Sequence, residues 1–249
     1  MTVAVEVRDR VLVVQMHRPE KRNAVDKQMA FGISAALDRL EDDPDLWVGI
    51  LTGTPDFFCA GTDPRDGVDA RTERGGEYGI IRRRRQKPLI SAVEGSALGG
   101  GMEIALACDL IVASTTALFA LPETRLGIIP TSGALFRAIR ALPLHIAKQL
   151  MIAGAALSAE RAHALGLVNV VTEPGCAVEE ALRLAADICA SSPVAVQATL
   201  AAVTAQFELA DEAGWQATAG ALDILANSED VHEGIAAFFE RRPPNWRGR

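Results

Sequence analysis

Short apolar runs and longer segments with helical spacing alternate along the first part of the chain. Val3–Val7 and Val11–Met16 are apolar runs separated by a charged turn, which predicts a β-hairpin. In Asp26–Leu40, apolar side chains recur at steps of three and four residues, which predicts a helix. Trp47–Thr52 and Leu89–Val93 are short apolar runs next to Gly or Pro, which predicts two buried strands.

The middle of the chain passes from a strand through a glycine cluster into a helix. Glycines at positions 95 and 99–101 precede Met102–Cys108, which predicts a turn followed by a buried helix. Leu110–Ala113 and Ala117–Leu121 are again strand-like. Strands that alternate with helices are typical of α/β proteins, and we expect this fold class here.

Helical patterns dominate the remainder of the chain. Ala134–Leu142, Pro143–Ala153 and Ser158–Leu165 predict helices, the last with Ser158 as its N-cap. Leu167–Thr172 predicts one more strand. After Cys176 the pattern is helical almost to the last residues, which contain prolines that cannot continue a helix.

The C-terminal helices form a separate part of the predicted organisation. Pro193 suits the first turn of a helix, and Asp230 begins an Asp-x-x-Glu pattern that predicts another helix start. We therefore expect residues 1–190 to form an α/β core and residues 191–249 to form an α-helical region.

Composition and charge narrow the classes of function. The chain has 249 residues, of which 49% are hydrophobic and 23% charged, which indicates a globular protein. A formal net charge of -7 argues against nucleic-acid and anionic-membrane partners. Neither a leader pattern nor a membrane-length apolar run occurs, so we expect a cytoplasmic protein. The four cysteines lack metal-site spacing, and we expect no metal.

Two glycine-containing segments, Phe57–Asp63 and Gly95–Glu103, are candidates for chemistry carried by the backbone. In the second, a strand leads through glycines into the N-terminus of a helix, where unpaired N–H groups can bind an oxyanion. The alternative is a tightly packed turn without a ligand. Dinucleotide-binding and phosphate-loop motifs are absent, which removes both cofactor classes.

Two glutamates stand in apolar surroundings. Glu103 lies within the apolar run Met102–Cys108, and Glu123 follows an apolar strand. A carboxylate among such neighbours is seldom buried without a partner or a function. For either glutamate alone, a salt bridge or a solvated turn is the competing interpretation, whereas the pair favours acid/base catalysis.

These features together resemble the enoyl-CoA hydratase/isomerase (crotonase) family over nearly the whole chain. The resemblance implies a crotonase-like spiral of ββα units with a C-terminal α-helical trimerisation region. It is carried by five segments in the family's order: Arg18–Ala24, Phe58–Asp63, Gly95–Glu103, Pro122–Pro130 and Glu233–Pro243.

Carried over by position, the resemblance assigns roles to individual residues. It implies that the backbone N–H groups of Thr62 and Gly100 form an oxyanion hole for the thioester carbonyl, and that Glu103 and Glu123 are the acid/base pair. It further implies coenzyme A contacts at these positions: Arg22, Ala24, Ala60, Thr62, Asp63, Arg65 and Gly100.

The presence of both glutamates ranks hydration above double-bond isomerisation. The resemblance therefore implies an enoyl-CoA hydratase of fatty-acid metabolism, which adds water reversibly and with syn geometry to a trans-2-enoyl-CoA. Coenzyme A is then part of the substrate, and we expect no separate cofactor. In the expected mechanism, Glu103 activates the water and Glu123 protonates the α-carbon.

Three positions depart from the family pattern and leave other activities open. Thr62 stands where the family most often has alanine, Pro64 where it usually has an apolar residue, and Thr131–Gly133 where it has an all-small turn. The added hydroxyls favour a polar or substituted acyl group, as in the carnitinyl-CoA dehydratase branch. A double-bond isomerase remains open, as does a non-catalytic scaffold or RNA-binding member.

Two further segments suggest surface functions. Arg82–Lys87 contains four successive arginines, for which we expect a solvated helix that faces a partner. Phe238, Phe239 and Trp246 are apolar residues near the C-terminus that one subunit alone would bury poorly. From the resemblance we expect a homotrimer, or a hexamer made of two trimers.

Overall fold

A six-stranded sheet forms the centre of the molecule in the computed structural model, which describes residues 2–66 and 70–248. Its strand order is β1-β2-β3-β7-β9-β12; β1 pairs antiparallel with β2, and all other neighbours are parallel. The strands are β1 (Val3–Arg8), β2 (Val11–Met16), β3 (Val48–Thr52), β7 (Leu89–Val93), β9 (Leu110–Ser114) and β12 (Val170–Thr172). The predicted hairpin and α/β class are confirmed.

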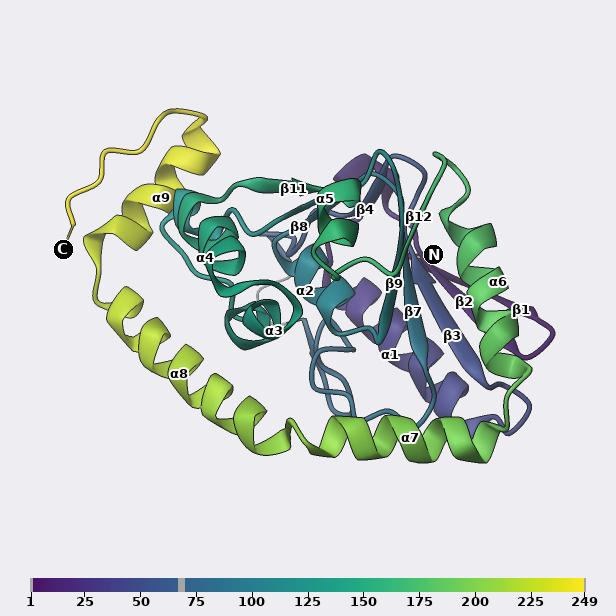
Figure 1. The fold of residues 1–249 in the computed structure, drawn as a ribbon. Coiled ribbons are helices and arrows are strands. Elements are labelled where there is room, and N and C mark those ends of the chain that lie inside the picture. Colours follow the sequence, from purple (N-terminus) through teal and green to yellow (C-terminus); the bar gives the residue numbers. More distant parts are fainter. Residues whose placement is uncertain (1, 67–69, 249) are drawn as a thin grey trace.

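Helices cover both faces of this sheet (Figure 1). Alternate residues of each strand point to opposite faces, so that Leu12 and Val14 join one apolar cluster while Val11 and Val13 join another. The first cluster contains α1 (Lys27–Asp42) and α2 (Gly100–Leu106), and the second contains α6 (Ala177–Cys189). Both faces are apolar because both are buried.

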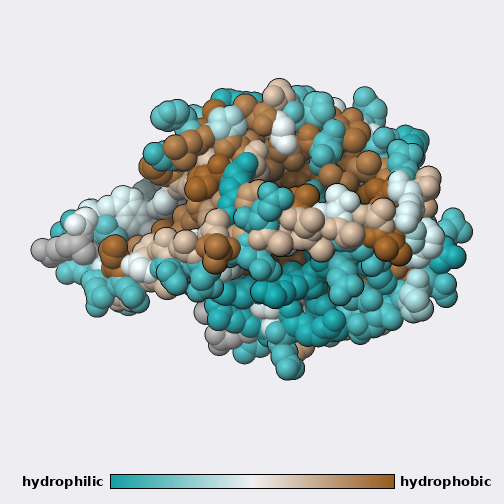
Figure 2. Space-filling model, turned by 60° about the horizontal axis from the view of Figure 1, so that its bottom comes forward, coloured by the Kyte–Doolittle hydropathy of each residue, from teal (hydrophilic) through white to brown (hydrophobic). Residues whose placement is uncertain are grey.

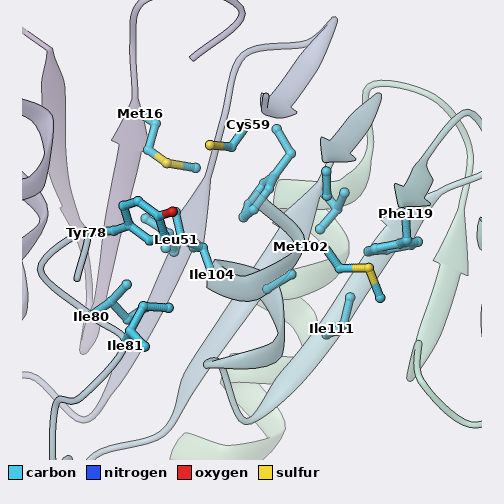
Figure 3. Packing of buried hydrophobic residues seen from close by; sticks show 14 of the residues in the cluster. Met16, Leu51, Cys59, Tyr78, Ile80, Ile81, Met102, Ile104, Ile111 and Phe119 are labelled. Atoms are coloured by element: carbon cyan, nitrogen blue, oxygen red, sulfur yellow. The ribbon is translucent and has the colours of Figure 1, made fainter. Parts of the chain in front are cut away.

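The larger cluster continues toward a second, four-stranded sheet with the order β11-β10-β8-β4. Figure 3 shows side chains of this cluster, with Tyr78 in the same group as Met16, Leu51 and Ile104. The strands are β4 (Phe57–Cys59), β8 (Ser96–Leu98), β10 (Leu118–Ala120) and β11 (Ala156–Ser158). The first three are parallel and β11 is antiparallel to β10, so β4, β8 and β10 all end at one edge.

Short elements connect the two sheets. Ser158 caps α5 by accepting a hydrogen bond from the Arg161 N–H at 3.3 Å, which confirms its predicted role. The elements are η1 (Pro19–Lys21), β5 (Arg71–Thr72), β6 (Gly76–Glu77), η2 (Glu123–Leu126), α3 (Ala134–Ala141), α4 (Leu144–Ala153) and α5 (Ala159–Ala164).

Three C-terminal helices, α7 (Pro193–Ala205), α8 (Glu208–Ala226) and α9 (Glu229–Glu240), run as an arc along the outside of the body (Figure 1). Pro193 occupies the first turn of α7, as predicted. The predicted start of α9 at Asp230 is wrong, because Ser228 is the N-cap. The Asp230 carboxylate instead accepts hydrogen bonds from backbone N–H groups of the C-terminal tail.

The arginine run Arg82–Lys87 is not the solvated helix that we expected. It forms turns and irregular chain, and its side chains bind different partners. The Arg83 side chain is only 1% exposed and binds Asp38, whereas the Arg84 side chain is 90% exposed. Arg85 binds Asp109. The segment is therefore held by separate tertiary contacts of its arginines and does not form a helix.

Large apolar side chains are exposed on the C-terminal helices. They include Val194 (75% exposed) on α7, and Leu209 (89%) and Ile224 (76%) on α8. Phe238, Phe239 and Trp246 are also exposed, as the sequence indicated. Figure 2, in which the bottom of Figure 1 comes forward, shows hydrophobic residues gathered in a broad area beside a hydrophilic one.

In the part of the chain that the structure describes, no single helix has the length and apolar composition to cross a membrane; α6 and α7 meet those criteria only as a pair bent by 105°. Residues 2–66 and 70–248 also contain no group of three or more His, Cys, Asp or Glu side chains that could hold a metal ion.

Candidate active site

The candidate site lies where β4, β8 and β10 end. Parallel strands bring their carboxyl ends to one edge of a sheet, and ligand sites of α/β proteins commonly lie there. Thr62 follows β4, Gly100 follows β8, and Glu123 follows β10. The Gly99 N–H donates to the Ala120 carbonyl at 2.9 Å, which ties the segments after β8 and β10 together.

The two predicted oxyanion segments are in close contact. A Cβ added at Gly61, whose φ is +93°, would lie 3.0 Å from the backbone N of Gly100. Gly100 is the first residue of α2, so its N–H has no acceptor within the helix. Among the described residues, neither the Gly100 N–H nor the Thr62 N–H donates to any acceptor. Both donors remain available for a ligand oxygen.

Glu103 is only 2% exposed and is fixed by the start of α3. Its Oε1 accepts hydrogen bonds from the N–H groups of Ser132 (2.7 Å) and Ala134 (3.1 Å). Burial raises the pKa of Glu103 to about 8; the two N–H groups act against this rise, and the charge on Glu123 adds to it. Glu103 therefore holds its proton up to a much higher pH than an exposed glutamate.

Glu123 is 8% exposed, and burial raises its pKa to about 7. Its Oε1 faces Gly99, where an added Cβ would lie 2.9 Å away. Its Oε2 is buried and has no hydrogen-bond partner among the described residues. A buried acceptor without a partner is unusual, and it indicates a place for a proton, a water molecule or a substrate atom.

A cavity of about 530 Å³ opens beside the oxyanion segments. The only charged residues lining it in the described chain are Arg71 and Glu77, which form a salt bridge of 2.7 Å. Neither Glu103 nor Glu123 lines the cavity, but Ser132, whose N–H binds Glu103, does. The described lining residues are Ala60, Thr62, Pro64, Ala70, Arg71, Glu77, Tyr78, Leu126, Ile128, Thr131, Ser132, Gly234, Ile235, Phe238 and Phe239.

The predicted coenzyme A residues occupy different places. Ala60 and Thr62 line the cavity. Arg22 is exposed, and its carbonyl accepts the Ala60 N–H at 3.0 Å, which places residues 22–24 beside the first oxyanion segment.

Asp63 and Arg65 belong to the loop that follows the first oxyanion segment. Asp63 is buried, and its carboxylate binds Arg18 at 3.1 Å and accepts the Arg65 N–H at 3.0 Å. Asp63 therefore shapes the loop, and its carboxylate is not free for a ligand.

Sequence reasoning missed Tyr78. This residue is the only tyrosine in the chain, and its hydroxyl lies 2.7 Å from Thr62 Oγ1. A Cβ added at Gly100 would lie 2.5 Å from the same hydroxyl oxygen. Tyr78 lies in a polar segment without periodicity; the flanking Gly75, Gly76 and Gly79 were the available indication of an unusual backbone there.

Comparison with known proteins assigns the family. The family model for enoyl-CoA hydratase/isomerase matches residues 6–249. The chain belongs to the enoyl-CoA hydratase/isomerase family. The crotonase fold is confirmed with it: a carnitinyl-CoA dehydratase from Mycobacterium avium 104 superposes with a TM-score of 0.93 at 39% identity, covering 100% of this chain and 99% of that chain.

Relatives within the enoyl-CoA hydratase/isomerase family include several CoA hydratases and dehydratases. A 2,3-dehydroadipyl-CoA hydratase from Escherichia coli is 36% identical, covering 96% of each chain. A carnitinyl-CoA dehydratase from Proteus mirabilis is 38% identical, covering 97% of each chain. The protein is thus an enzyme of the crotonase hydratase/dehydratase family, whose substrates are acyl-CoA thioesters.

Proposed function

We propose that this protein is an enoyl-CoA hydratase that adds water reversibly, with syn geometry, to a trans-2-enoyl-CoA to give a 3-hydroxyacyl-CoA. The observation that carries the proposal is the combination of two buried glutamates of raised pKa with two unpaired backbone N–H groups at one sheet edge. Coenzyme A is part of the substrate, and the proposal needs no separate cofactor.

The backbone donors act on the thioester. Addition of water to the β-carbon places negative charge on the thioester oxygen, and the N–H groups of Thr62 and Gly100 would stabilise that charge. Donors fixed in position before the reaction contribute about 3 kcal/mol each to the transition state. Glycine at position 100 leaves room for the Tyr78 hydroxyl, which would lie only 2.5 Å from an added Cβ.

The glutamates move the protons. With pKa values of about 8 and about 7, Glu103 and Glu123 together hold one proton just above neutral pH, so one carboxylate and one carboxylic acid coexist. The pKa values alone would leave that proton on Glu103, so our assignment uses the other one-proton form, with the proton on Glu123. In this form Glu103 takes a proton from the water, and the N–H groups of Ser132 and Ala134 stabilise its charge. Glu123, with Oε2 unpaired, delivers a proton to the α-carbon.

A second candidate is dehydration of a substituted 3-hydroxyacyl-CoA, as in the carnitinyl-CoA dehydratases. The observation that favours it is the row of hydroxyls at Thr62, Tyr78, Thr131 and Ser132 along the cavity wall. The single lining ion pair leaves the cavity without net charge. The hydroxyls of this wall suit an acyl group with a hydrogen-bonding substituent.

The remaining proposals concern recognition, location and assembly. Arg22 and Arg65 are exposed beside the first oxyanion segment, and we retain residues 22–24 and Arg65 as contacts for the CoA moiety. We also retain a cytoplasmic protein, assembled as a trimer or hexamer through its C-terminal helices. The exposed apolar residues on α7 and α8 support this assembly.

Loss of the conjugated enoyl-thioester absorbance tests the proposed hydration. Wild-type protein is mixed with short, medium and hydroxyl-substituted trans-2-enoyl-CoAs, and we expect turnover that ranks these substrates. Glu123→Gln should lower kcat at least 100-fold because its amide cannot donate the required acidic proton. Glu73→Gln, an exposed glutamate, is the matched control and should retain full activity.

The other outcomes separate the alternatives. Turnover undiminished in Glu123→Gln would overturn the assigned mechanism. Thermal stabilisation by CoA thioesters without hydration would favour a specialised dehydratase or isomerase, because a bound ligand stabilises the native state. Absence of both turnover and stabilisation would favour the scaffold alternative.

A further inference from the structure

The Tyr78 hydroxyl touches both residues that supply the predicted oxyanion donors. Its oxygen lies 2.7 Å from Thr62 Oγ1. It also occupies the space above Gly100, since a Cβ there would lie 2.5 Å from the hydroxyl oxygen and 2.8 Å from the ring carbon that bears it. Tyr78 lines the acyl cavity as well. The Tyr78 hydroxyl is therefore adjacent to both donor residues, on a side chain that also lines the cavity.

The backbone of Tyr78 is held in an unusual conformation. Its φ is +55°, in the left-handed region that a bulky side chain rarely adopts. The Tyr78 N–H donates to the Ala70 carbonyl at 2.8 Å, and the next residue, Gly79, packs so closely on α1 that a Cβ would lie 2.2 Å from the Ala30 carbonyl. Such conformations cost about 1 kcal/mol or more and are concentrated at functional sites.

The ring itself is fixed by the core. Tyr78 is 6% exposed and belongs to the cluster that contains Leu51 and Ile104 (Figure 3). Burial and the charge on Glu103 raise the pKa of the Tyr78 phenol above its ordinary value, although hydrogen bonding with Ser132 and Thr62 opposes this rise. The phenol therefore remains protonated, and thus a donor, throughout the neutral pH range.

The hydroxyl protons can be accounted for individually. Thr62 and Tyr78 each carry one hydroxyl proton, and the contact between their oxygens uses one of the two. When Thr62 donates to the phenol oxygen, the Tyr78 proton can go to Ser132, which also hydrogen-bonds with the phenol, or to a ligand oxygen in the cavity. Thr62 then orients the phenol, which gives a function to the Thr62 hydroxyl.

We propose that Tyr78 is a third hydrogen-bond donor to the thioester oxygen, oriented by Thr62 and acting beside the N–H groups of Thr62 and Gly100. This proposal rests on the proposed hydratase function and adds a catalytic residue to it. The phenol donates a hydrogen bond while negative charge develops on the thioester oxygen, and it keeps its proton throughout. Proton transfer remains with the two glutamates.

Removal of the two hydroxyls tests the proposal. Tyr78→Phe keeps the ring over Gly100, and Thr62→Val keeps the β-branched shape. We expect Tyr78→Phe to lower kcat about 100-fold, the typical loss for one oxyanion donor, with KM changed less than threefold. Thr62→Val should lower kcat less, and the double variant should resemble Tyr78→Phe because Thr62 acts through the phenol.

A spectroscopic measurement tests the same contact without turnover. A conjugated aryl-enoyl-CoA thioester absorbs at longer wavelength when its carbonyl accepts strong hydrogen bonds. Its red shift on binding wild-type protein should be largely lost in Tyr78→Phe and partly lost in Thr62→Val, while the melting temperature of both variants stays close to wild type. An unchanged red shift together with unchanged kcat in Tyr78→Phe would overturn the proposal.

This design separates the two proposals from each other. If the wild-type protein binds the chromophoric thioester but hydrates nothing, the hydratase proposal fails while the red shift still reports on Tyr78. If Tyr78→Phe hydrates normally and wild-type turnover depends on Glu123, only the Tyr78 proposal fails. Loss of melting temperature in Tyr78→Phe would assign the residue a structural role, which also contradicts the proposal.

Discussion

At the scale of single residues, burial of Glu103 and Glu123 has an energetic consequence. An unfolded chain gives both carboxyls the ordinary glutamate pKa of 4.5, whereas the native protein raises these pKa values to about 8 and about 7. Between about pH 4.5 and pH 8, the native state therefore binds more protons than the unfolded state. Its free energy of unfolding falls as the pH rises from about 4.5 toward 8, because ionisation is opposed by burial.

We therefore predict that Glu103→Gln stabilises the protein at alkaline pH. The neutral amide keeps an oxygen for the Ser132 and Ala134 N–H groups and removes the buried charge. We expect a melting temperature at least about 2–4 °C above wild type at pH 9, corresponding to 1 kcal/mol or more. At pH 5.5 the two proteins should differ little. Differential scanning calorimetry across this pH range measures the effect.

The control for this experiment is an exposed glutamate. Glu73→Gln removes the same charge at an exposed position and should change the melting temperature by less than about 1 °C at either pH. A pH-independent difference between Glu103→Gln and wild type would contradict the raised pKa of Glu103.

Residues differ in how far the sequence reveals them. Glu103 and Glu123 can be identified from the sequence alone, because each is a charged residue within or directly after an apolar run. Tyr78 is not, because its contacts with Thr62 and Gly100 depend on how distant segments meet in the fold. The ion pair between Asp63 and Arg18 is likewise a tertiary contact, which the sequence does not reveal.

At the scale of elements, apolar periodicity predicts the main strands and helices well. The predicted strand Leu89–Val93 agrees with β7 at both ends, because a short apolar run that follows a proline is local information. The arginine run illustrates the opposite case. Arg83 bends inward to Asp38 and Ser34 on α1, and helical spacing contains no information about such a partner.

We predict that Arg83 stabilises the packing of this segment on α1. The Arg83 guanidinium binds Asp38 Oδ1 at 2.7 Å and Ser34 Oγ at 2.9 Å. Arg83→Met should lower the free energy of unfolding by about 3 kcal/mol and the melting temperature by roughly 6–12 °C. Arg84→Met makes the same substitution at a 90% exposed side chain and should have almost no effect. Equal losses in both variants would indicate a general charge effect.

At the scale of the whole molecule, the exposed apolar residues of α7 and α8 predict association of subunits. We expect light scattering to give a mass three or six times that of the 26.5 kDa chain. Leu209→Glu, at an 89% exposed position, should shift the population toward smaller species, because a charge on an apolar interface opposes association.

Val7→Glu places the same charge at an exposed apolar position on the edge strand β1 and serves as the control. It should leave the measured mass unchanged. A monodisperse wild-type monomer would contradict the predicted assembly. Equal dissociation in both variants would show that the subunit interface is not specific to α8.

The position of α9 in the cavity wall has a consequence for synthesis of the protein on the ribosome. Ile235 and Phe238 line the acyl cavity, yet they are translated long after both glutamates and both oxyanion segments. Domains begin to fold from the N-terminal end during translation. A nascent chain can thus assemble the acid/base pair while the cavity still lacks one wall. The wall that α9 supplies is therefore the last part of the candidate site to be synthesised.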